Sequence, residues 1–523
     1  MSEVLHVEGL RIEARGAPIL DGIALSLQKG KVLGLIGESG AGKSTLGLAA
    51  IGYLKAGCAV TAGRVRLLGQ DLGQQSPEAL RALRRHRISY VAQSAAAAFN
   101  PFWRLERQVT ELAVTPDRRA LARDLFARLH LPEPEVFGRR YPHQVSGGQL
   151  QRAMIAMALA NRPELVVFDE PTTALDVTTQ VEVLAQIRQV VAEQGCAALY
   201  ITHDLAVVAQ MADDILVLRH GRMVEQGAVR QIVEAPRTEY ARALVAHRSG
   251  SAPPEAAESA PLLAAVGLEL GYGRKVIVQE VSLAVPRGQV LAIVGESGSG
   301  KTTVARALAG LIAPRTGSVR LEGRALAPLV EGRSAEDRRR LQFIHQLPDV
   351  ALNPRHPLRE IIGRPLTLFH GLSGAAFQTR LAALMADVEL PVALLDRVPG
   401  ALSGGQKQRV CIARALAAEP DLLICDEITS ALDPLVEDGI LALLQRLMQS
   451  RSLGIVFITH NLGLTRRFAH RVAVMERGRI VEEGATGTVF EAPAQPYTRR
   501  LLAAAPQMRA GWLTEAIGSL RPE

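Results

Sequence analysis

Two segments of the sequence carry residue types that bind phosphate. GESGAGKS begins at Gly37 and GESGSGKT begins at Gly295, and both match the pattern G-x-x-x-x-G-K-[ST]. Glycines in this pattern let backbone N–H groups close around phosphate oxygens, and the following helix presents its positive end to the same anion. The lysine reaches the β- and γ-phosphates, and the next hydroxyl contacts Mg²⁺. The predicted nucleotide-binding residues are Gly37, Glu38, Ser39, Gly40, Ala41, Gly42, Lys43, Ser44, Thr45, Gly295, Glu296, Ser297, Gly298, Ser299, Gly300, Lys301, Thr302 and Thr303, with Ser44 and Thr302 also as metal ligands.

A pair of acidic residues follows a short apolar run in each half of the chain. LVVFDE contains Asp169 and Glu170, and LLICDE contains Asp426 and Glu427. Burying adjacent carboxylates without a counter-charge is costly, so each pair indicates a bound cation and a polarised water. We predict that the aspartates bind Mg²⁺ and that the glutamates are general bases. Such a pair alone could equally cap the next helix, but its place after a phosphate loop favours catalysis.

Histidines and glutamines recur at matched positions in the two halves. His203 and His460 each lie 33 residues after the glutamate of the acidic pair. A neutral imidazole there could hydrogen-bond the γ-phosphate, although a single histidine after a strand is more often a packed or capping residue. Gln93 and Gln346 end predicted strands, where an amide could contact Mg²⁺ or water. A surface glutamine is the plain alternative for both.

A serine and two glycines begin a helical run in each half, within VSGGQ and LSGGQ. This arrangement is a second anion-binding nest. A domain with a complete phosphate loop does not need another nest for its own nucleotide. We therefore predict that each nest serves a nucleotide held by the other copy. The residues concerned are Ser146, Gly147, Gly148, Gln149, Ser403, Gly404, Gly405 and Gln406.

The elements that carry these motifs occur twice, in the same order. Lys43 and Lys301 are 258 residues apart, which is far too long a period for a solenoid and indicates two copies of a whole domain. We predict a first domain over 1–246 and a second over 262–523. Between them, HRSGSAPPEAAESAP over 247–261 has the composition of a flexible linker.

Short apolar runs and longer helical stretches alternate within each copy. KVLGLI, ELVVFD and ALYIT, at 31–36, 164–169 and 198–202, read as strands, and 181–194 reads as an amphipathic helix. This alternation predicts a mostly parallel α/β core.

Composition bounds the class of protein. The chain has 523 residues, of which 48% are hydrophobic, and a net charge of +8. The basic balance fits an anionic ligand, a nucleic acid, a membrane surface or a coding bias, and it selects none of them. Four scattered cysteines without a CxxC pair argue against structural zinc, an iron–sulfur cluster and a disulfide framework. No signal pattern and no uncharged apolar stretch of ~18 residues occurs, so we expect a soluble chain that meets membranes only through partners.

The motifs together resemble those of ATP-binding-cassette (ABC) ATPases over nearly the whole chain. The resemblance implies two tandem P-loop NTPase nucleotide-binding domains, each with a RecA-like parallel-sheet core, an antiparallel β portion and a helical subdomain carrying the signature SGGQ. It also implies ATP and Mg²⁺ bound at two shared sites. Site one would pair 37–45, Gln93, Asp169, Glu170 and His203 with Ser403–Gln406. Site two would pair 295–303, Gln346, Asp426, Glu427 and His460 with Ser146–Gln149, and Asp176 and Asp433 would be loop aspartates that cross the interface.

A finer resemblance is to the cassettes of peptide, nickel and opine importers. AFNPF at 98–102, ALNPR at 351–355 and the tail VFEAPAQPYTRRLLAAAP at 489–506 carry it, and IVEAPRTEYARALVAH at 232–247 is a weaker copy of the tail. It implies an energy-coupling ATPase at the cytoplasmic face of the inner membrane. The implied partners are two membrane-spanning permease subunits and an extracytoplasmic substrate-binding protein, with no nucleic acid. The cargo stays open among peptides, opines, nickel and glutathione-like solutes, with peptides preferred.

Some features depart from the family pattern. Tyr272 lies 29 residues before Lys301, where the family usually stacks an aromatic ring on adenine, but the equivalent residue in the first copy is Ala14. Site one is therefore expected to bind ATP more weakly, and Val145 replaces the usual signature leucine. The alternative is a soluble tandem cassette acting on ribosomes. That class generally has a longer, highly charged helical linker, which this chain lacks.

Overall fold

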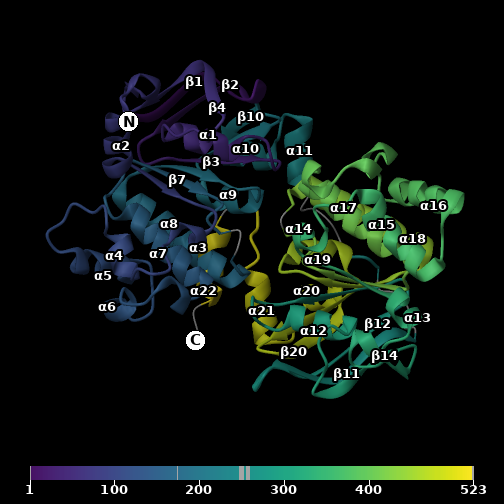
Figure 1. Ribbon diagram of the computed structural model, residues 1–523. Helices are drawn as coiled ribbons and strands as arrows, with labels where there is room; N and C mark the ends of the chain where they lie inside the picture. Colours follow the sequence, from purple (N-terminus) through teal and green to yellow (C-terminus); the bar gives the residue numbers. More distant parts are fainter. Residues whose placement is uncertain are drawn as a thin grey trace. The chain divides into compact units, whose positions relative to one another are not determined.

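The computed structural model describes residues 2–172, 175–246, 252–254, 260–430, 432–509 and 511–520. The chain divides into two compact units (Figure 1). Unit 1 consists of Met1–His247 and Pro506–Glu523, and unit 2 of Arg248–Ala505. Most of the predicted linker, 247–251 and 255–259, lies outside the described residues, and its last residue, Pro261, already begins a strand.

Unit 1 contains a four-stranded antiparallel sheet, in the order β2-β1-β4-β5, and a six-stranded sheet, in the order β10-β9-β3-β8-β7-β6. Its elements are β1 (Glu3–Ala14), β2 (Ala17–Gln28), β3 (Val32–Gly37), α1 (Lys43–Ala50), β4 (Cys58–Leu67), β5 (Gln70–Asp71), α2 (Pro77–His86), β6 (Ile88–Val91), α3 (Ala95–Ala98), α4 (Leu105–Val109), α5 (Arg118–Arg128), α6 (Pro134–Phe137), α7 (Gly147–Leu159), β7 (Leu165–Asp169), α8 (Val177–Gln194), β8 (Ala197–Ile201), α9 (Leu205–Met211), β9 (Asp214–Arg219), β10 (Arg222–Ala228), α10 (Val229–Glu234), α11 (Glu239–Ala246) and α22 (Trp512–Leu520).

Unit 2 repeats this architecture, with sheets in the orders β12-β11-β14-β15 and β16-β17-β18-β13-β19-β20. Its elements are β11 (Pro261–Tyr272), β12 (Lys275–Pro286), β13 (Val290–Val294), α12 (Lys301–Ala309), β14 (Thr316–Leu321), β15 (Arg324–Ala325), α13 (Ala335–Arg340), β16 (Leu341–Ile344), α14 (Pro348–Ala351), α15 (Leu358–His370), α16 (Gly374–Asp387), α17 (Gly404–Leu416), β17 (Leu422–Asp426), α18 (Pro434–Arg451), β18 (Gly454–Ile458), α19 (Leu462–Phe468), β19 (Arg471–Glu476), β20 (Arg479–Ala485), α20 (Thr486–Glu491) and α21 (Pro496–Ala503).

The large sheets are parallel except for their last pair of strands, β9–β10 and β19–β20. The three predicted strands of the first copy are β3, β7 and β8, and all residues of β7 and β8 are buried. Continuous apolar runs are typical of parallel strands that are covered on both faces. Helix α8 begins four residues earlier than predicted because the carboxylate of Asp176 accepts a hydrogen bond from Thr179 N–H and caps it. The predicted α/β class is confirmed.

One apolar core in each unit joins the two sheets through the helix that follows the phosphate loop. In unit 1 it includes Leu46 and Ala50 of α1 with Leu10 of the antiparallel sheet and Leu199 of the parallel sheet. Unit 2 repeats it around Leu308 of α12. Burial of this helix on both sides fixes its N-terminus, where the phosphate loop ends.

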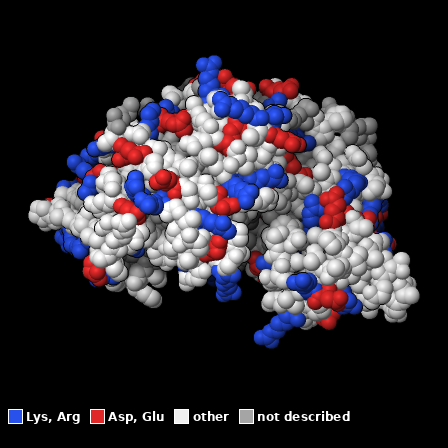
Figure 2. Space-filling model, turned by 90° about the horizontal axis from the view of Figure 1, so that it is seen from above, with Lys and Arg blue, Asp and Glu red and all other residues white. Residues whose placement is uncertain are grey.

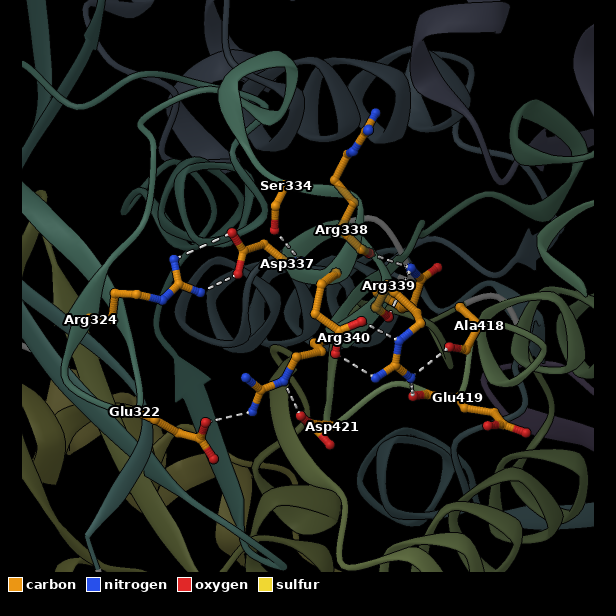
Figure 3. A network of polar contacts seen from close by, with 12 residues as sticks. Glu322, Arg324, Ser334, Asp337, Arg338, Arg339, Arg340, Ala418, Glu419 and Asp421 are labelled. Carbon is orange, nitrogen blue, oxygen red and sulfur yellow. Dashed lines mark hydrogen bonds and ion pairs between the residues drawn. The ribbon is translucent and has the colours of Figure 1, made fainter. Parts of the chain in front are cut away.

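A network of arginines anchors the start of β17, the strand that delivers the acidic pair of unit 2 (Figure 3). Arg340 donates hydrogen bonds to the carboxylates of Asp421 and Glu322. The neighbouring Arg339 donates to the carbonyl oxygens of Ala418 and Glu419. Charge-assisted hydrogen bonds of this kind are stronger than neutral ones. The network therefore holds the beginning of β17 in place against α13.

The end of the chain packs differently from the prediction. The sequence assigned 262–523 to the second domain, but Pro506–Glu523 group with unit 1. The reason is helix α22, which lies against α8, with Trp512 and Leu513 each 1% exposed and Ala516 also buried. The first unit is thus built from both ends of the chain.

The exposed charges are mixed in sign. On the face drawn in Figure 2, lysines and arginines are interspersed with aspartates and glutamates. The net charge of +8 is therefore not gathered into one basic patch on that face. Among the described residues, none of the helices combines the length and apolar character needed to cross a bilayer.

Candidate active sites

The two phosphate loops have the backbone that the glycine pattern predicts. Gly42 and Gly300 have φ of 95° and 105° and each directly precedes the helix that begins at the loop lysine. A Cβ on Gly37 would lie 2.1 Å from the carbonyl oxygen of Leu218, so a side chain there would force β3 and β9 apart. Glycine is therefore required at these positions by conformation and by space.

Both loop lysines are buried and point back into their own loops. Lys43 is 7% exposed, and its Nζ donates hydrogen bonds to the carbonyl oxygens of Gly37 and Glu38 at 2.7 and 2.9 Å. Lys301 makes the same two bonds to Gly295 and Glu296, both at 2.8 Å. Each ammonium group is thus held inside the loop where phosphates are predicted to bind.

The predicted metal ligands lie together in each unit. Ser44 Oγ is 3.1 Å from Asp169 Oδ1, and Thr302 Oγ1 is 3.0 Å from Asp426 Oδ1. Burial raises the pKa of Asp426 above its ordinary value, although the hydrogen bond from Thr302 opposes the shift. Burial makes the ionised form of this carboxylate unfavourable, and a nearby cation would stabilise that form.

A glutamine and a histidine meet the predicted general base in each unit. Gln93 Nε2 donates to Glu170 Oε2 at 3.0 Å, and His203 Nδ1 is 3.3 Å from Glu170 Oε1. Burial alone would lower the pKa of His203, but the hydrogen bond and the charge of Glu170 together outweigh it, so this pKa is raised. The structure thus places side by side three residues that the family resemblance assigned to one site.

The second unit has the same arrangement. Gln346 Nε2 donates to Glu427 Oε2 at 2.7 Å, and His460 Nδ1 lies 3.6 Å from Glu427 Oε1. His460 lowers the pKa of Glu427 against the effect of burial. Glu427 is therefore a carboxylate at neutral pH, as a general base must be.

Both predicted bases have an uncommon backbone conformation. Glu170 and Glu427 have φ of 50° and 47°, in the left-handed region that residues with side chains seldom adopt. Such strain costs of order 1–3 kcal/mol and is often found at functional sites. The same conformation also occurs at other matched pairs, such as His220 and Arg477, so it is a feature of the repeated fold and not by itself a sign of catalysis.

The signature segments are N-termini of long helices. Ser146 caps α7 through the N–H of Gln149, while the amide oxygen of Gln149 accepts the N–H of Ser146. Ser403 and Gln406 form the same capping box on α17. A Cβ on Gly148 would lie 2.6 Å from Thr179 Cγ2, so glycine allows α7 to approach α8. Ser146 and Gly147 are exposed.

The loop aspartates also cap helices. Asp176 accepts hydrogen bonds from the N–H and hydroxyl of Thr179. Asp433 accepts one from Val436 N–H at the start of α18. Within its own unit, each therefore fixes the beginning of the helix that follows the acidic pair.

Tyr90 is a site residue that the motifs did not reveal. Its hydroxyl donates to Asp169 Oδ2 at 2.5 Å, while Ser44 contacts the other oxygen of that carboxylate. Burial and this bond raise the pKa of Tyr90 well above its usual value. Phe343 occupies the matching position, three residues before Gln346. Within a strand, a tyrosine gives no signal of this role, so only the pairing of β6 with β7 exposes it.

The tail motif contacts the phosphate loop in each unit. The backbone N–H of Glu38 donates to Tyr240 Oη at 3.2 Å, and that of Glu296 donates to Tyr497 Oη at 3.1 Å. Both tyrosines are 6% exposed. The sequence analysis identified the tail only as a family signature. In the structure, the tail tyrosine accepts a hydrogen bond from the residue that follows the first glycine of the phosphate loop.

Tyr272 and Ala14 occupy equivalent positions in the two units. Tyr272 ends β11 and pairs with Lys275, and Ala14 ends β1 and pairs with Ala17 in the same register. Tyr272 is 48% exposed and thus accessible to a ligand. At this position the second unit therefore has an aromatic ring and the first unit has only a methyl group.

We expect Tyr272→Ala to weaken ATP binding at the second site roughly 5- to 160-fold, since base–aromatic stacking is worth about 1–3 kcal/mol. Ala14→Tyr should strengthen binding at the first site. Titration of each variant with a fluorescent ATP analogue measures both effects. Tyr53→Ala, an exposed tyrosine of unit 1, is the control. Equal affinities in Tyr272→Ala and the unaltered chain would contradict the stacking role.

Two family models match the chain. The model described as ABC transporter matches residues 20–173 and 278–430, which together are more than half of the chain. The model described as oligopeptide/dipeptide transporter, C-terminal region, matches residues 481–523. The first model covers every motif from the phosphate loop to the acidic pair in both units.

Curated relatives match over nearly their whole length. The "Glutathione import ATP-binding protein GsiA" of Shigella dysenteriae is 36% identical over 557 aligned residues, covering 96% of this chain and 89% of the relative. The protein of the same name from Escherichia coli K12 gives the same identity and coverage. Among solved structures, cbiO1 of Clostridium perfringens, titled part of the ABC transporter complex cbiONQ, is 26% identical with a TM-score of 0.42, covering 45% of this chain and 92% of that one.

The family models and the curated relatives support the importer interpretation and not the ribosomal alternative. They agree with the paired phosphate loops, acidic pairs and signature helices described above. The chain belongs to the ABC transporter family, as a fused tandem ATP-binding ATPase subunit of the peptide-importer type.

Proposed function

We propose that this protein hydrolyses ATP to drive import of a small peptide-like solute, of which glutathione is the first candidate. The observation that carries the proposal is the match to glutathione import ATP-binding proteins along both units and the tail. Transport of a peptide, an opine or nickel uses the same type of subunit. In this type of importer the solute is recognised by other chains. The proposal of glutathione therefore rests on the names of the relatives and not on residues of this chain.

We propose that each ATP site is shared between the two copies. The nucleotide held by Lys43 would be completed by the signature Ser403–Gln406, and the nucleotide held by Lys301 by Ser146–Gln149. Support comes from the signature serines, which are exposed N-caps of thirteen-residue helices. Exposed N–H groups at a helix start favour an anion supplied from outside the unit. Asp176 and Asp433 would complete this arrangement as the loop aspartates between the copies.

Mg²⁺ is the metal that fits the residues present. Mg²⁺ is usually held by one or two carboxylates together with substrate phosphates and water. In the proposal, Ser44, Asp169 and Gln93 hold it at one site, and Thr302, Asp426 and Gln346 at the other. The hydroxyl–carboxylate pairs at 3.0 and 3.1 Å support this assignment. Bound there, the ion would neutralise charge on the transferred phosphoryl group.

Tyr90→Phe should raise the Mg²⁺ concentration that half-saturates the first site roughly 10-fold. Partners of a metal-binding carboxylate typically contribute about 10–100-fold to metal affinity. The reason is the loss of the hydroxyl that orients Asp169. Phe343→Tyr, which alters only the silenced second site, is the control and should leave the half-saturation point unchanged. ATPase activity is measured against Mg²⁺ concentration in a Glu427→Gln background. An unchanged half-saturation point would contradict a role for Tyr90.

Exposed apolar side chains follow each predicted glutamine loop and suit a protein partner. Phe102 is 84% exposed in unit 1, and Val350 is 83% and Leu347 54% exposed in unit 2. These side chains are not at matched positions, since Phe102 corresponds to Arg355, but exposed apolar surface in either segment can mark a protein interaction site. We propose that they contact two membrane-spanning permease subunits, which work with an extracytoplasmic substrate-binding protein. The chain would then lie peripherally at the cytoplasmic face of the inner membrane.

The test is a pull-down from native membranes with the double variant Glu170→Gln and Glu427→Gln in the presence of ATP. Mass spectrometry should recover two multispanning proteins and a binding protein, and the binding protein then identifies the cargo. Phe102→Ser with Val350→Ser should lose these partners, and Val60→Ser, a 45% exposed control, should keep them. Recovery of ribosomal proteins instead would refute the transport role.

A further inference from the structure

The last residues of the region matched by the oligopeptide/dipeptide transporter C-terminal model make contacts with unit 1. Residues 506–509 and 511–520, here called the C-terminal clasp, belong to unit 1, although they follow unit 2 in sequence. Helix α22 lies against α8. Val181 and Ala185 of α8 line a hollow of about 690 Å³ together with Leu513 and Ile517 of α22. The contact thus involves one face of each helix.

Gln210 of α9 binds the clasp with its whole amide group. Its Nε2 donates to the carbonyl oxygens of Gln507 and Arg509 at 2.8 and 3.0 Å. Its Oε1 accepts the backbone N–H of Leu513 at 3.4 Å. Since the first N–H groups of a helix have no partner inside it, Gln210 acts as a cap for α22 from another part of the chain.

The clasp is ordered by its own side chains and anchored by apolar burial. Arg509 forms an ion pair with Glu515 and donates to Gln507 Oε1, which fixes the turn before α22. Trp512 is 1% exposed, whereas the other tryptophan, Trp103, is only partly buried. Burial of a tryptophan is a large apolar contribution to binding.

The corresponding surface of unit 2 is closed to such a segment. Residues 203 and 460 differ by 257, as do 210 and 467, and 181 and 438. Unit 2 therefore has Arg467 and Asp438 where unit 1 has Gln210 and Val181. Arg467 Nη1 donates to Asp438 Oδ1 at 2.9 Å. The ion pair occupies the place where unit 1 offers an amide and an apolar side chain, so the clasp fits unit 1 alone.

We propose that the clasp binds the α8/α9 surface of unit 1 in order to keep the two ATP-binding units of one chain together as the working pair. The linker is one covalent connection between the units. The clasp adds a second, noncovalent one, because it binds unit 1 while its chain continues directly from the last residues of unit 2. A second tether raises the effective concentration of one unit near the other. Closure then takes place within one chain and does not need a second copy. This inference does not depend on the transported solute.

The experiment uses the full chain with a protease recognition sequence inserted at 252–254, within the predicted linker. After cleavage in the absence of ATP, size-exclusion chromatography shows whether the two fragments stay together. All variants carry Trp103→Phe, so that fluorescence reports Trp512 alone. Co-elution of the cleaved fragments with a blue-shifted, buried Trp512 emission is the expected result.

Two variants weaken the clasp in different ways. Q210A should raise the dissociation constant of the cleaved fragments about 10-fold, equivalent to about 1.4 kcal/mol. V181D with Q210R transfers the unit 2 ion pair, which the same fold already accommodates, and should separate the fragments and expose Trp512. R467Q alters only the matching place in unit 2 and should leave co-elution unchanged. Thermal unfolding of each intact variant checks that both units still fold.

Two results would overturn the inference. Separation of the unaltered fragments would show that the clasp does not hold the units together. Co-elution of V181D with Q210R as firmly as the unaltered protein would show that another contact does so. ATP binding, followed separately with a fluorescent analogue, should be unchanged in both variants, because neither residue touches a phosphate loop.

Discussion

Replacing both Glu170 and Glu427 by glutamine should lower ATP turnover roughly 100- to 10,000-fold, the range that general acid–base catalysis typically contributes. Each carboxylate is met by a glutamine amide and by a histidine within its own unit. The hydrogen bond from His460 lowers the pKa of Glu427, so the group is ionised at neutral pH, which is the form that a general base needs. Glutamine keeps the shape of the side chain but cannot accept that proton.

The measurement is phosphate release at saturating ATP, together with ATP retention on the purified chain. Retention should persist because the loop lysines are untouched. Glu193→Gln, an exposed residue of α8, is the control and should keep full turnover. A double variant that retains more than about a tenth of the turnover would show that these glutamates are not the bases. Such a small loss corresponds to less than about 1.36 kcal/mol of transition-state stabilisation.

The single variants separate the two sites. If both sites hydrolyse ATP, Glu170→Gln and Glu427→Gln should each reduce turnover substantially. Near-normal turnover in Glu170→Gln with complete loss in Glu427→Gln would show that the first site is not an equal partner. The differences at Tyr90 and Ala14 make this comparison informative, because both alter the first site alone.

Local patterns predicted the parts of the site that depend on short segments. The apolar runs at 31–36 and 164–169 became β3 and β7, because buried parallel strands need continuous apolar residues. The glycines before Lys43 became a loop that only glycine tolerates. These features follow from neighbouring residues, so the printed sequence was sufficient for them.

Contacts across long separations could not be predicted in the same way. Glu38 and Tyr240 are 202 residues apart, and Gln210 and Arg509 are 299 apart. Nothing in the local pattern of either member names its partner. Tyr90 fits a strand as well as Phe343 does, so its bond to Asp169 depends on the pairing of β6 with β7. The assignment of 506–520 to the second domain differed from the structure for the same reason.

Removing one loop lysine should abolish ATP binding at one site and leave the other intact. Lys43 and Lys301 are each held by two loop carbonyl oxygens at 2.7–2.9 Å. Without the lysine, ATP loses the charge-assisted hydrogen bonds that its phosphates are predicted to receive from the ammonium group. Such bonds are worth about 1.5–3 kcal/mol each, so loss of two should weaken binding roughly 100-fold or more. Calorimetric titration with ATP should show the stoichiometry fall from two sites per chain to one in Lys43→Ala or Lys301→Ala.

Lys31→Ala is the matched control, because Lys31 is a surface residue paired with Asp213, away from the phosphate loop. It should keep both sites. The affinity left in each single variant then measures the remaining site by itself. Lys43→Ala retains the site that has Tyr272, and Lys301→Ala retains the site that has Ala14, so the first variant should bind its ATP more tightly. The reverse order would mean that the adenine ring does not use Tyr272, and that the difference between β1 and β11 does not set the affinity of the two sites.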